Sequence, residues 1–128
     1  VSVKRTSLKW STENVTTGVR DGENGANNME IIKGISGWED KYPAFKWCSD
    51  YGEGWYLPAY NELQAIYNNL STINATLKAN GYTTLDMYYY WTSNEINSSS
   101  AHKLGFALSG SNDNSKSKAY RVCAVLAF

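Results

Sequence analysis

The chain of 128 residues has the length of one ordinary domain, and its 42% hydrophobic and 19% charged residues are typical of a folded protein rather than a disordered one. Its 12 basic and 12 acidic residues give a formal net charge of zero, which argues against the basic surface of a nucleic-acid-binding protein. No apolar run is long enough for a membrane helix, and no signal peptide is visible; the chain opens at Val1 without Met, as a mature fragment would.

The front of the chain mixes strand and helix patterns. Residues 3–19 hold Val, Thr and Trp in weak alternation, which predicts one or two strands. The Asp-Gly-Glu-Asn-Gly run at 21–25 indicates a turn. Residues 26–33 predict a short helix, and the two glycines within 34–38 are expected to break it.

The middle of the chain is helical. Pro43 indicates a helix start, because Pro is tolerated at the first helical position, and Gly52 is placed to follow the end of that helix. Residues 60–70 carry apolar side chains at i, i+3, i+4 and i+7, which predicts the strongest helix of the chain. A further helix is expected over 72–80, capped by Ser71.

Strand patterns replace the helical period from residue 88 onward. The ranges 88–93, 101–108 and 119–128 are strand-like, and the polar ranges 94–100 and 110–118 are expected to be loops. Helices followed by a run of antiparallel strands predict an α+β fold, with residues 1–128 as a single domain.

A Leu-Pro pair marks the boundary between an extended segment and the strongest helix. Pro58 forces the residue before it to be extended and cannot continue a sheet ladder. Position 59 is then expected to be the N-cap, with Glu62 at the third helical position, where its carboxylate reaches back to the N-cap N–H. We therefore interpret Glu62 as a capping residue rather than a catalytic acid. The capping box is incomplete, because Ala59 has no side-chain oxygen to accept a hydrogen bond from the helix.

Three segments together carry a family resemblance: Trp-Tyr-Leu-Pro-x-x-x-Glu-Leu at 55–63, Tyr-Trp-x-Ser-x-Glu at 90–95, and Val-Cys-Ala-Val-Leu-Ala-Phe at 122–128. This pattern resembles a bacterial branch of the C-type lectin fold, the C-terminal domain of many surface lipoproteins and fimbrillin-like proteins of gut Bacteroidetes. The resemblance covers roughly residues 40–128. Formylglycine-generating enzymes share a related Leu-Pro-Thr-x-x-Glu element, so a degenerate relative of those enzymes is an alternative.

The resemblance implies that the strand-and-loop region 94–120 is a ligand-binding face. In relatives from gut bacteria and phages, this region is rewritten by diversity-generating retroelements, which mutate template adenines and turn Asn codons into Asn, Ser, Tyr, His, Asp or Gly. Lys103 does not come from such a codon, and polar loops are often plain solvated segments. Of Tyr88 and Tyr89, alternation places one outside. The expected ligand-binding residues are Tyr89, Asn94, Ile96, Asn97, Ser98, His102, Lys103, Gly105, Ser111, Asn112, Asn114 and Tyr120.

Two cysteines, Cys48 and Cys123, lie far apart in the chain, and the residues alone leave a disulfide and two buried thiols as alternatives. The resemblance implies the pairing, because C-type lectins join a helix cysteine to one in the last strand. The usual bacterial register puts that cysteine one residue later, which turns the side chain to the other face of the strand. The Cys48–Cys123 bond is therefore a possible disulfide.

The residue types argue against an enzyme. His102 is the single histidine and would have to serve every catalytic scheme, so we recognise no Ser/His/Asp grouping, and no Cys-x-x-Cys or His-x-x-x-His metal spacing occurs. The Glu-Pro-Asn and Gln-Pro-Asp calcium triplets of animal C-type lectins are absent, and carboxylates near Ser93 are few. We expect no catalytic residues, no metal and no cofactor.

Together these observations predict a ligand-binding adhesin domain on a bacterial cell surface or secreted, plausibly at a pilus tip. The expected partner is an unidentified host or bacterial receptor, glycan or protein, with pilin subunits as possible neighbours, no nucleic acid and no membrane insertion. A structural stalk domain that binds nothing is the first alternative. The degenerate formylglycine-generating-enzyme relative is the second, and it would need an organised reactive thiol.

Overall fold

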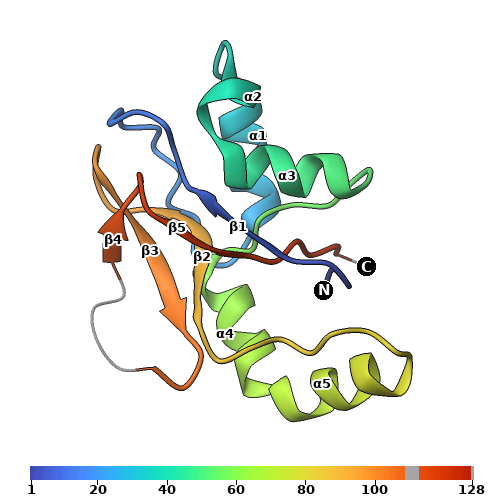
Figure 1. Ribbon diagram of the computed structural model, residues 1–128. Coiled ribbons are helices and arrows are strands. Elements are labelled where there is room, and N and C mark those ends of the chain that lie inside the picture. Colours follow the sequence, from blue (N-terminus) through green and yellow to red (C-terminus); the bar gives the residue numbers. More distant parts are fainter. Residues whose placement is uncertain (109–112, 128) are drawn as a thin grey trace.

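The computed structural model of the protein describes residues 1–108 and 113–127. Five strands form one sheet in the order β1-β5-β2-β3-β4, in which β2 and β5 run parallel and the other neighbours run antiparallel (Figure 1). The elements are β1 Thr6–Lys9, α1 Gly25–Lys33, α2 Trp38–Lys41, α3 Pro43–Tyr51, α4 Tyr60–Asn68, α5 Leu70–Ala79, β2 Tyr89–Glu95, β3 Ser100–Gly105, β4 Asp113–Ser115 and β5 Ala119–Val122. The helices come first and most of the strands follow, so the prediction of a mixed α+β arrangement is confirmed at this level.

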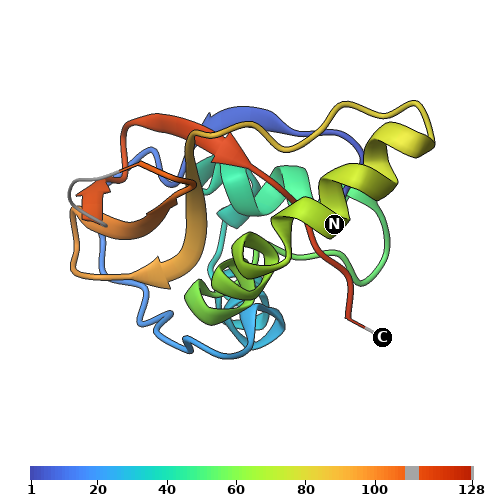
Figure 2. The same ribbon diagram turned by 90° about the horizontal axis from the view of Figure 1, so that it is seen from below.

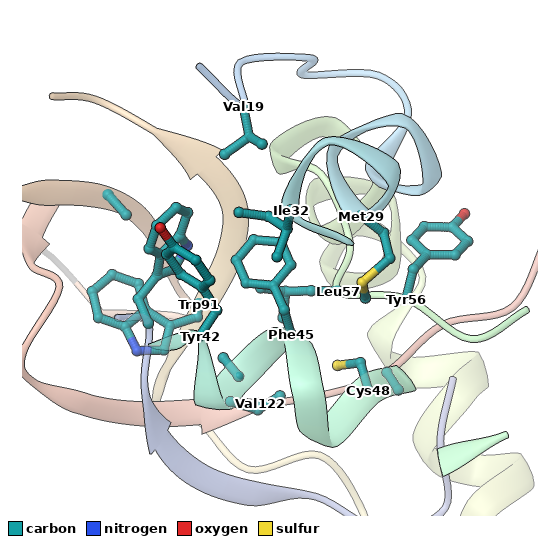
Figure 3. Packing of buried hydrophobic residues seen from close by; sticks show 14 of the residues in the cluster. Val19, Met29, Ile32, Tyr42, Phe45, Cys48, Tyr56, Leu57, Trp91 and Val122 are labelled. Atoms are coloured by element: carbon teal, nitrogen blue, oxygen red, sulfur yellow. The ribbon is translucent and has the colours of Figure 1, made fainter. Parts of the chain in front are cut away.

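Helices cover both faces of the sheet. Helices α1 to α3 lie on one side and α4 and α5 on the other, and Figure 2 shows α4 and α5 from their own side (Figures 1 and 2). Successive side chains of a strand point to opposite faces, so Trp91 packs into the core under α1 and α3 while Tyr90 packs towards α4 and α5. Figure 3 shows the first core, where Phe45 and Ile32 meet Trp91.

The start of α4 confirms the interpretation of the Leu-Pro stretch. Ala59 is the N-cap, and its N–H donates to Oε1 of Glu62 at 3.0 Å. The same oxygen accepts the N–H of Gly25 at 2.7 Å, and the hydroxyl of Tyr56 donates to the other oxygen at 2.5 Å. A Cβ on Gly25 would lie 2.4 Å from the carbonyl oxygen of Leu57, so only glycine fits there. Glu62 therefore joins the starts of α1 and α4.

Several element predictions were wrong. Trp38 begins the short helix α2 because Gly37, at φ 74°, turns the chain directly into it. The helix that was expected over 72–80 begins at Leu70 rather than after a Ser71 cap. The range 110–118 contains β4, which forms because Asn114 pairs with Ala101 of β3; tertiary pairing outweighs its polar composition.

The ends of the predicted strand ranges also differ. Of residues 3–19, only β1 is a strand. The last strand ends at Val122, although Val125 makes an isolated bridge with Tyr56. The N–H of Ser2 donates to the carbonyl of Ala124 at 2.7 Å, so the two ends of the chain lie side by side (Figure 1). Among the described residues, no helix is both long and apolar enough to span a membrane.

A buried ion pair ties the irregular front of the chain to the sheet. Lys116 Nζ lies 2.7 Å from Glu95 Oε2, and both side chains are 0% exposed. Glu95 also accepts the N–H groups of Thr17 and Gly18, at 2.8 and 3.0 Å, while Lys116 donates to the carbonyl of Val15 at 3.0 Å. Burial would raise the pKa of Glu95, but these hydrogen bonds outweigh it and hold that pKa below its ordinary value.

Both cysteines are free, buried thiols in the structure, which is the second of the two alternatives that the sequence left open. Cys48 lies in α3, and Cys123 follows β5 with its sulfur 3.7 Å from the hydroxyl of Ser2. Burial raises the pKa of both thiols. A buried thiol with a raised pKa is protonated at neutral pH and is a poor nucleophile.

Candidate functional site

The structure divides the expected ligand-binding residues between the two faces of β3. Lys103 lies on the face that carries Trp91, its cross-strand partner in β2, whereas His102 lies on the opposite face beside α4. The turn between β2 and β3 holds Ile96, Asn97 and Ser98. Two further expected residues, Ser111 and Asn112, lie outside the described residues.

On the Lys103 face, four of the expected residues come together as a group that we call the tyrosine cluster: Tyr89, Lys103, Asn114 and Tyr120. The Lys103 ammonium lies 3.9 Å from the centre of the Tyr89 ring and 4.7 Å from that of Tyr120. The amide of Asn114 donates to the Tyr120 hydroxyl at 2.7 Å. The Tyr89 and Tyr120 rings meet edge to face at 5.8 Å, so the cluster is a packed and ordered set of side chains.

Two aromatic rings lie against the charge of Lys103. The residue is only 5% exposed, and among the described side chains it forms no ion pair. Its ammonium lies 3.4 Å from the Tyr120 hydroxyl and close to two ring faces, which attract a cation. Lys103 was expected to contact ligand directly, but its burial makes it a support for the tyrosines instead.

Exposed apolar side chains occur next to the tyrosine cluster: Tyr88 lies against Tyr89, Leu108 and Tyr89 both approach Gly105, and Met87 precedes Tyr88 in the chain. Met87, Tyr88 and Leu108 are 53%, 40% and 41% exposed. Tyr88 lies edge to face with Tyr89 at 6.2 Å, so alternation did place one of this pair outside, and it is Tyr88. The guanidinium of Arg121 lies 4.6 Å from the centre of the Tyr88 ring. Sequence reasoning did not assign Met87 and Leu108 to this surface.

Leu108, the last residue of the range predicted to be a strand, lies beyond the end of that strand and is exposed. The strand β3 ends at Gly105, and Ala107 has a φ of 61°, in the left-handed region. This turn ends the in-and-out alternation of the strand before Leu108 is reached. Glycine at position 105 allows Tyr89 and Leu108 to pack closely. A Cβ there would lie 2.9 Å from the Tyr89 ring and 3.0 Å from the carbonyl oxygen of Leu108. Gly105 thus makes room for neighbouring side chains rather than offering contacts of its own.

On the opposite face of β3, a small hollow of about 260 Å³ lies between His102 and the start of α4. Tyr60 meets the imidazole edge to face at 5.7 Å, and Asn61 and Gly22 complete the rim. Asn94 also lines the hollow, but it is 5% exposed and its Oδ1 accepts the N–H of Tyr60 at 2.6 Å. Asn94 therefore has a structural role in holding the start of α4, which the sequence pattern did not reveal.

Asn97, one of the expected binding residues, stabilises the turn between β2 and β3. Asn97 Oδ1 accepts the N–H groups of Ser99 and Ser100, at 3.0 and 2.9 Å, which fixes the turn. Asn97 and Ser98 are exposed, and Ile96 is half-buried. The turn is thus ordered by its own hydrogen bonds and presents Ser98 at its tip.

The described part of the chain can be compared with the expectation of no metal site. No group of three or more His, Cys, Asp or Glu side chains there is placed to hold a metal ion. The carboxylate of Asp86 is used by Arg121 at 2.9 Å and by the Tyr90 hydroxyl at 2.6 Å. The arrangement is suited to contact through rings, amides and apolar side chains.

Comparison with known proteins shows a similarity in fold. No protein-family model matches the chain, and no curated protein matches it either. A solved structure of a fimbrial protein from Bacteroides ovatus is similar, with a TM-score of 0.69 and 20% sequence identity over 94% of this chain. The match covers 34% of that chain, so the present chain spans about a third of the fimbrial protein's length.

Proposed function

We propose that the chain is a surface-exposed, ligand-binding adhesin domain of C-type-lectin-like fold, carried on a pilus and plausibly at its tip. Support for the pilus comes from the fold that it shares with a fimbrial protein. Support for the lectin-like fold comes from the Leu-Pro and Trp-x-Ser-x-Glu motifs at 57–62 and 91–95. The binding surface is the side of β2, β3 and β4 that carries the tyrosine cluster, and no bond chemistry takes place there.

The observation that carries the proposal is the tyrosine cluster with its exposed neighbour Tyr88. The Tyr88 ring is 40% exposed and is held by a guanidinium and a second tyrosine, so it adds an ordered, accessible aromatic ring to the tyrosine cluster. Tyrosines provide a large contact area at a low entropic cost, and they are enriched among residues that dominate binding. The stalk alternative predicts instead that this side of the sheet lacks an exposed aromatic patch.

The alternative of a degenerate formylglycine-generating enzyme is disfavoured by the state of the thiols. Such a relative needs a reactive cysteine that is accessible and partly ionised. Cys48 and Cys123 are both buried, and burial raises both pKa values. Titration of the folded protein with a thiol reagent should therefore show two slowly reacting groups that become reactive only on unfolding.

Binding of the labelled domain to immobilised epithelial-cell surfaces, to mucin and to intact bacterial cells tests the proposed function. We expect saturable binding to at least one of these surfaces, and loss of that binding in a Tyr88→Ser variant. Tyr82→Ser is the matched control, because Tyr82 is 50% exposed but lies with Val1 and α5 in a different groove. Absence of saturable binding to every surface, or equal loss in both variants, would favour the stalk.

We also propose that a diversity-generating retroelement rewrites the codons of this binding face, and the DNA around the gene tests this. A reverse-transcriptase gene and a near-copy of the codons for residues 90–128, differing only opposite adenines, would support it. If neither is present, the face is fixed and the adhesin proposal stands on binding alone.

A further inference from the structure

We infer that the domain has a second binding site, a polar hollow beside β1 and β5 that takes an acidic sugar residue. The hollow has a volume of about 550 Å³, which lies within the range of small-molecule sites. It is lined by residues 3–7 and by Thr83, Thr84, Asp86 and Arg121. The hollow shares no residue with the tyrosine cluster, so this site does not depend on the proposed function.

The hollow and the tyrosine cluster lie on opposite faces of the sheet. Arg121 follows Tyr120 in β5, and successive side chains of a strand point to opposite faces. Ser7 of β1 is the cross-strand partner of Arg121, so the hollow lies at the β1 edge of the sheet. Strand β4, which contains Asp113, lies at the other edge, beyond β2 and β3. The charges considered for the hollow are therefore those of the residues that line it.

Arg5 joins the two segments that enclose the hollow. Its Nη1 donates to the carbonyl oxygens of Ser2 and Val3, at 3.1 and 3.0 Å. Its Nη2 donates to the carbonyl oxygen of Thr84 at 2.9 Å and to that of Thr83. Figure 2 shows the segment that carries these two threonines as it crosses from α5 to β2. Because carbonyl oxygens orient a guanidinium without neutralising it, the hollow is held in shape by a residue that keeps its full positive charge.

The side chain of Arg121 is held in place but keeps free donors. Its Nε and Nη2 donate to Oδ2 of Asp86, at 3.1 and 2.9 Å, and its Nη1 donates to the hydroxyl of Ser7 at 2.7 Å. A guanidinium has five N–H groups, and these bonds use three of them. Each terminal nitrogen therefore keeps one N–H group without a partner among the described residues. A donor that is already oriented loses little entropy when a ligand binds.

The charges around the hollow are unbalanced. Three of the lining residues, Lys4, Arg5 and Arg121, are basic and one, Asp86, is acidic, which leaves an excess of two positive charges. Lys4 is exposed, and among the described side chains it forms no ion pair. Lys4 and Arg121 can therefore make charge-assisted hydrogen bonds to the carboxylate or sulfate group of a ligand.

The uncharged part of the lining favours a sugar as the carrier of that anionic group. The hydroxyls of Thr6, Thr83 and Thr84 have no hydrogen-bond partner among the described residues. Each of them can both donate and accept, as the hydroxyl groups of a sugar ring do. Val3 is the single hydrophobic residue of the lining, and none of the lining residues is aromatic, so no ring is present there on which a nucleobase would stack.

Titration of the isotope-labelled domain with small sugars, followed by NMR, tests the inference. The probes are glucuronic acid, N-acetylneuraminic acid and N-acetylglucosamine 6-sulfate, with glucose as the uncharged control. We expect saturable shifts of the amide signals of Thr83, Thr84 and Arg121 with at least one acidic sugar, and none with glucose. The carboxylate and sulfate probes separate the two sources of negative charge.

Two results of this titration would overturn the inference. One is the absence of a shift with every acidic sugar, or an equal shift with glucose. The other is that acetate or sulfate ions alone bind as tightly as the acidic sugars, which would make the hollow a site for simple anions. Either result leaves the proposal for the tyrosine cluster unchanged, because that surface lies on the opposite face of the sheet.

Variants with matched controls test whether the hollow makes the contact. Lys4→Gln should weaken binding of the acidic sugar several-fold, because it removes one of the two excess charges. Lys9→Gln is its control, since Lys9 is exposed on β1 but does not line the hollow. Thr84→Val should also weaken binding, whereas Thr16→Val, which changes an exposed threonine elsewhere, should not.

Ionic strength gives a further test of the charge argument. Affinity for the acidic sugar should fall as salt is added, because the attraction between exposed charges is screened. If Lys4→Gln and Lys9→Gln bind alike, or if salt leaves the affinity unchanged, the hollow is not the site of an anionic ligand.

Discussion

Two lysines of this protein are withdrawn from solvent in different ways. Lys116 is 0% exposed and reaches the carboxylate of Glu95, whereas Lys103 is 5% exposed and, among the described side chains, reaches two tyrosine rings and one phenol oxygen. The first lysine closes the interior by tying residues 15–18 to the sheet, and the second lies just beneath the surface that we propose binds a ligand. In this protein, the ion pair of Lys116 with Glu95 stabilises the interior, whereas Lys103 orders the tyrosine side chains near the surface.

Lys116→Met should have the largest effect on stability. Removing one member of a buried ion pair leaves the other uncompensated, which typically lowers the free energy of unfolding by about 3–5 kcal/mol. Urea denaturation followed by tryptophan fluorescence measures this. A loss below about 1 kcal/mol would contradict the buried pair, because that is the range of exposed ion pairs. The double variant Glu95→Gln with Lys116→Met should recover part of the loss.

Lowering the pH should remove the contribution of Glu95 to the stability of the fold. Since the folded-state pKa of Glu95 lies below its ordinary value of 4.5, its ionised form stabilises the fold above that pH, and the contribution disappears as pH falls through the folded-state pKa. The difference in thermal midpoint between the wild type and Glu95→Gln should therefore be largest near pH 7 and should shrink below about pH 4. A difference that is constant from pH 7 to pH 3 would show that Glu95 is not held ionised by Lys116.

Lys103→Met should destabilise the protein far less than Lys116→Met. It removes cation–π contacts worth about 0.5–2 kcal/mol, but it leaves no carboxylate unpaired among the described side chains. Its larger effect should be on ligand affinity, because Tyr89 and Tyr120 lose the side chain that orders them. Equal losses of stability in the two variants, measured by the same urea titration, would remove the contrast between the two lysines.

Ala59→Ser should have the smallest effect. A serine supplies the missing half of the capping box with Glu62, and a favourable N-cap is worth about 0.5–1 kcal/mol in free energy of unfolding. Ala59→Val, which adds bulk without an acceptor, is the control. If serine gives no gain, the buried position lacks room for the hydroxyl near the N–H of the third helical residue.

Sequence reasoning succeeded where the determining residues are neighbours in the chain. The α3 and α4 helices and the capping role of Glu62 depend on spacings of three or four residues, which the sequence displays directly. The partner of Lys116 is 21 residues away, and β4 exists because of its pairing with β3, so neither was predicted. Tertiary contacts of this kind leave no local pattern.

The same limit explains the mixed outcome at the candidate site. Polar residue type suggested contact with ligand for Asn94 and Asn97, but each fills a hydrogen-bonding position of the backbone instead. Conversely, leucine is a residue type common in protein cores, but Leu108 is exposed because Ala107 before it adopts a left-handed backbone conformation. That Ala107 adopts this conformation could not be read from the sequence, since alanine does not favour it.

The proximity of the two chain ends has a mechanical consequence. Ser2 is hydrogen-bonded to Ala124, and behind that contact β1 and β5 pair antiparallel from Thr6 and Val122 onward. Tension that pulls the two ends apart therefore breaks the Ser2–Ala124 and β1–β5 hydrogen bonds one after another. It does not load them all together in shear. Tension between one end and a ligand on the tyrosine cluster would instead be transmitted across the sheet to β2 and β3. If the domain is carried on a pilus and binds a receptor, as we propose, force applied through the ligand would therefore load different strands from force applied at the two ends.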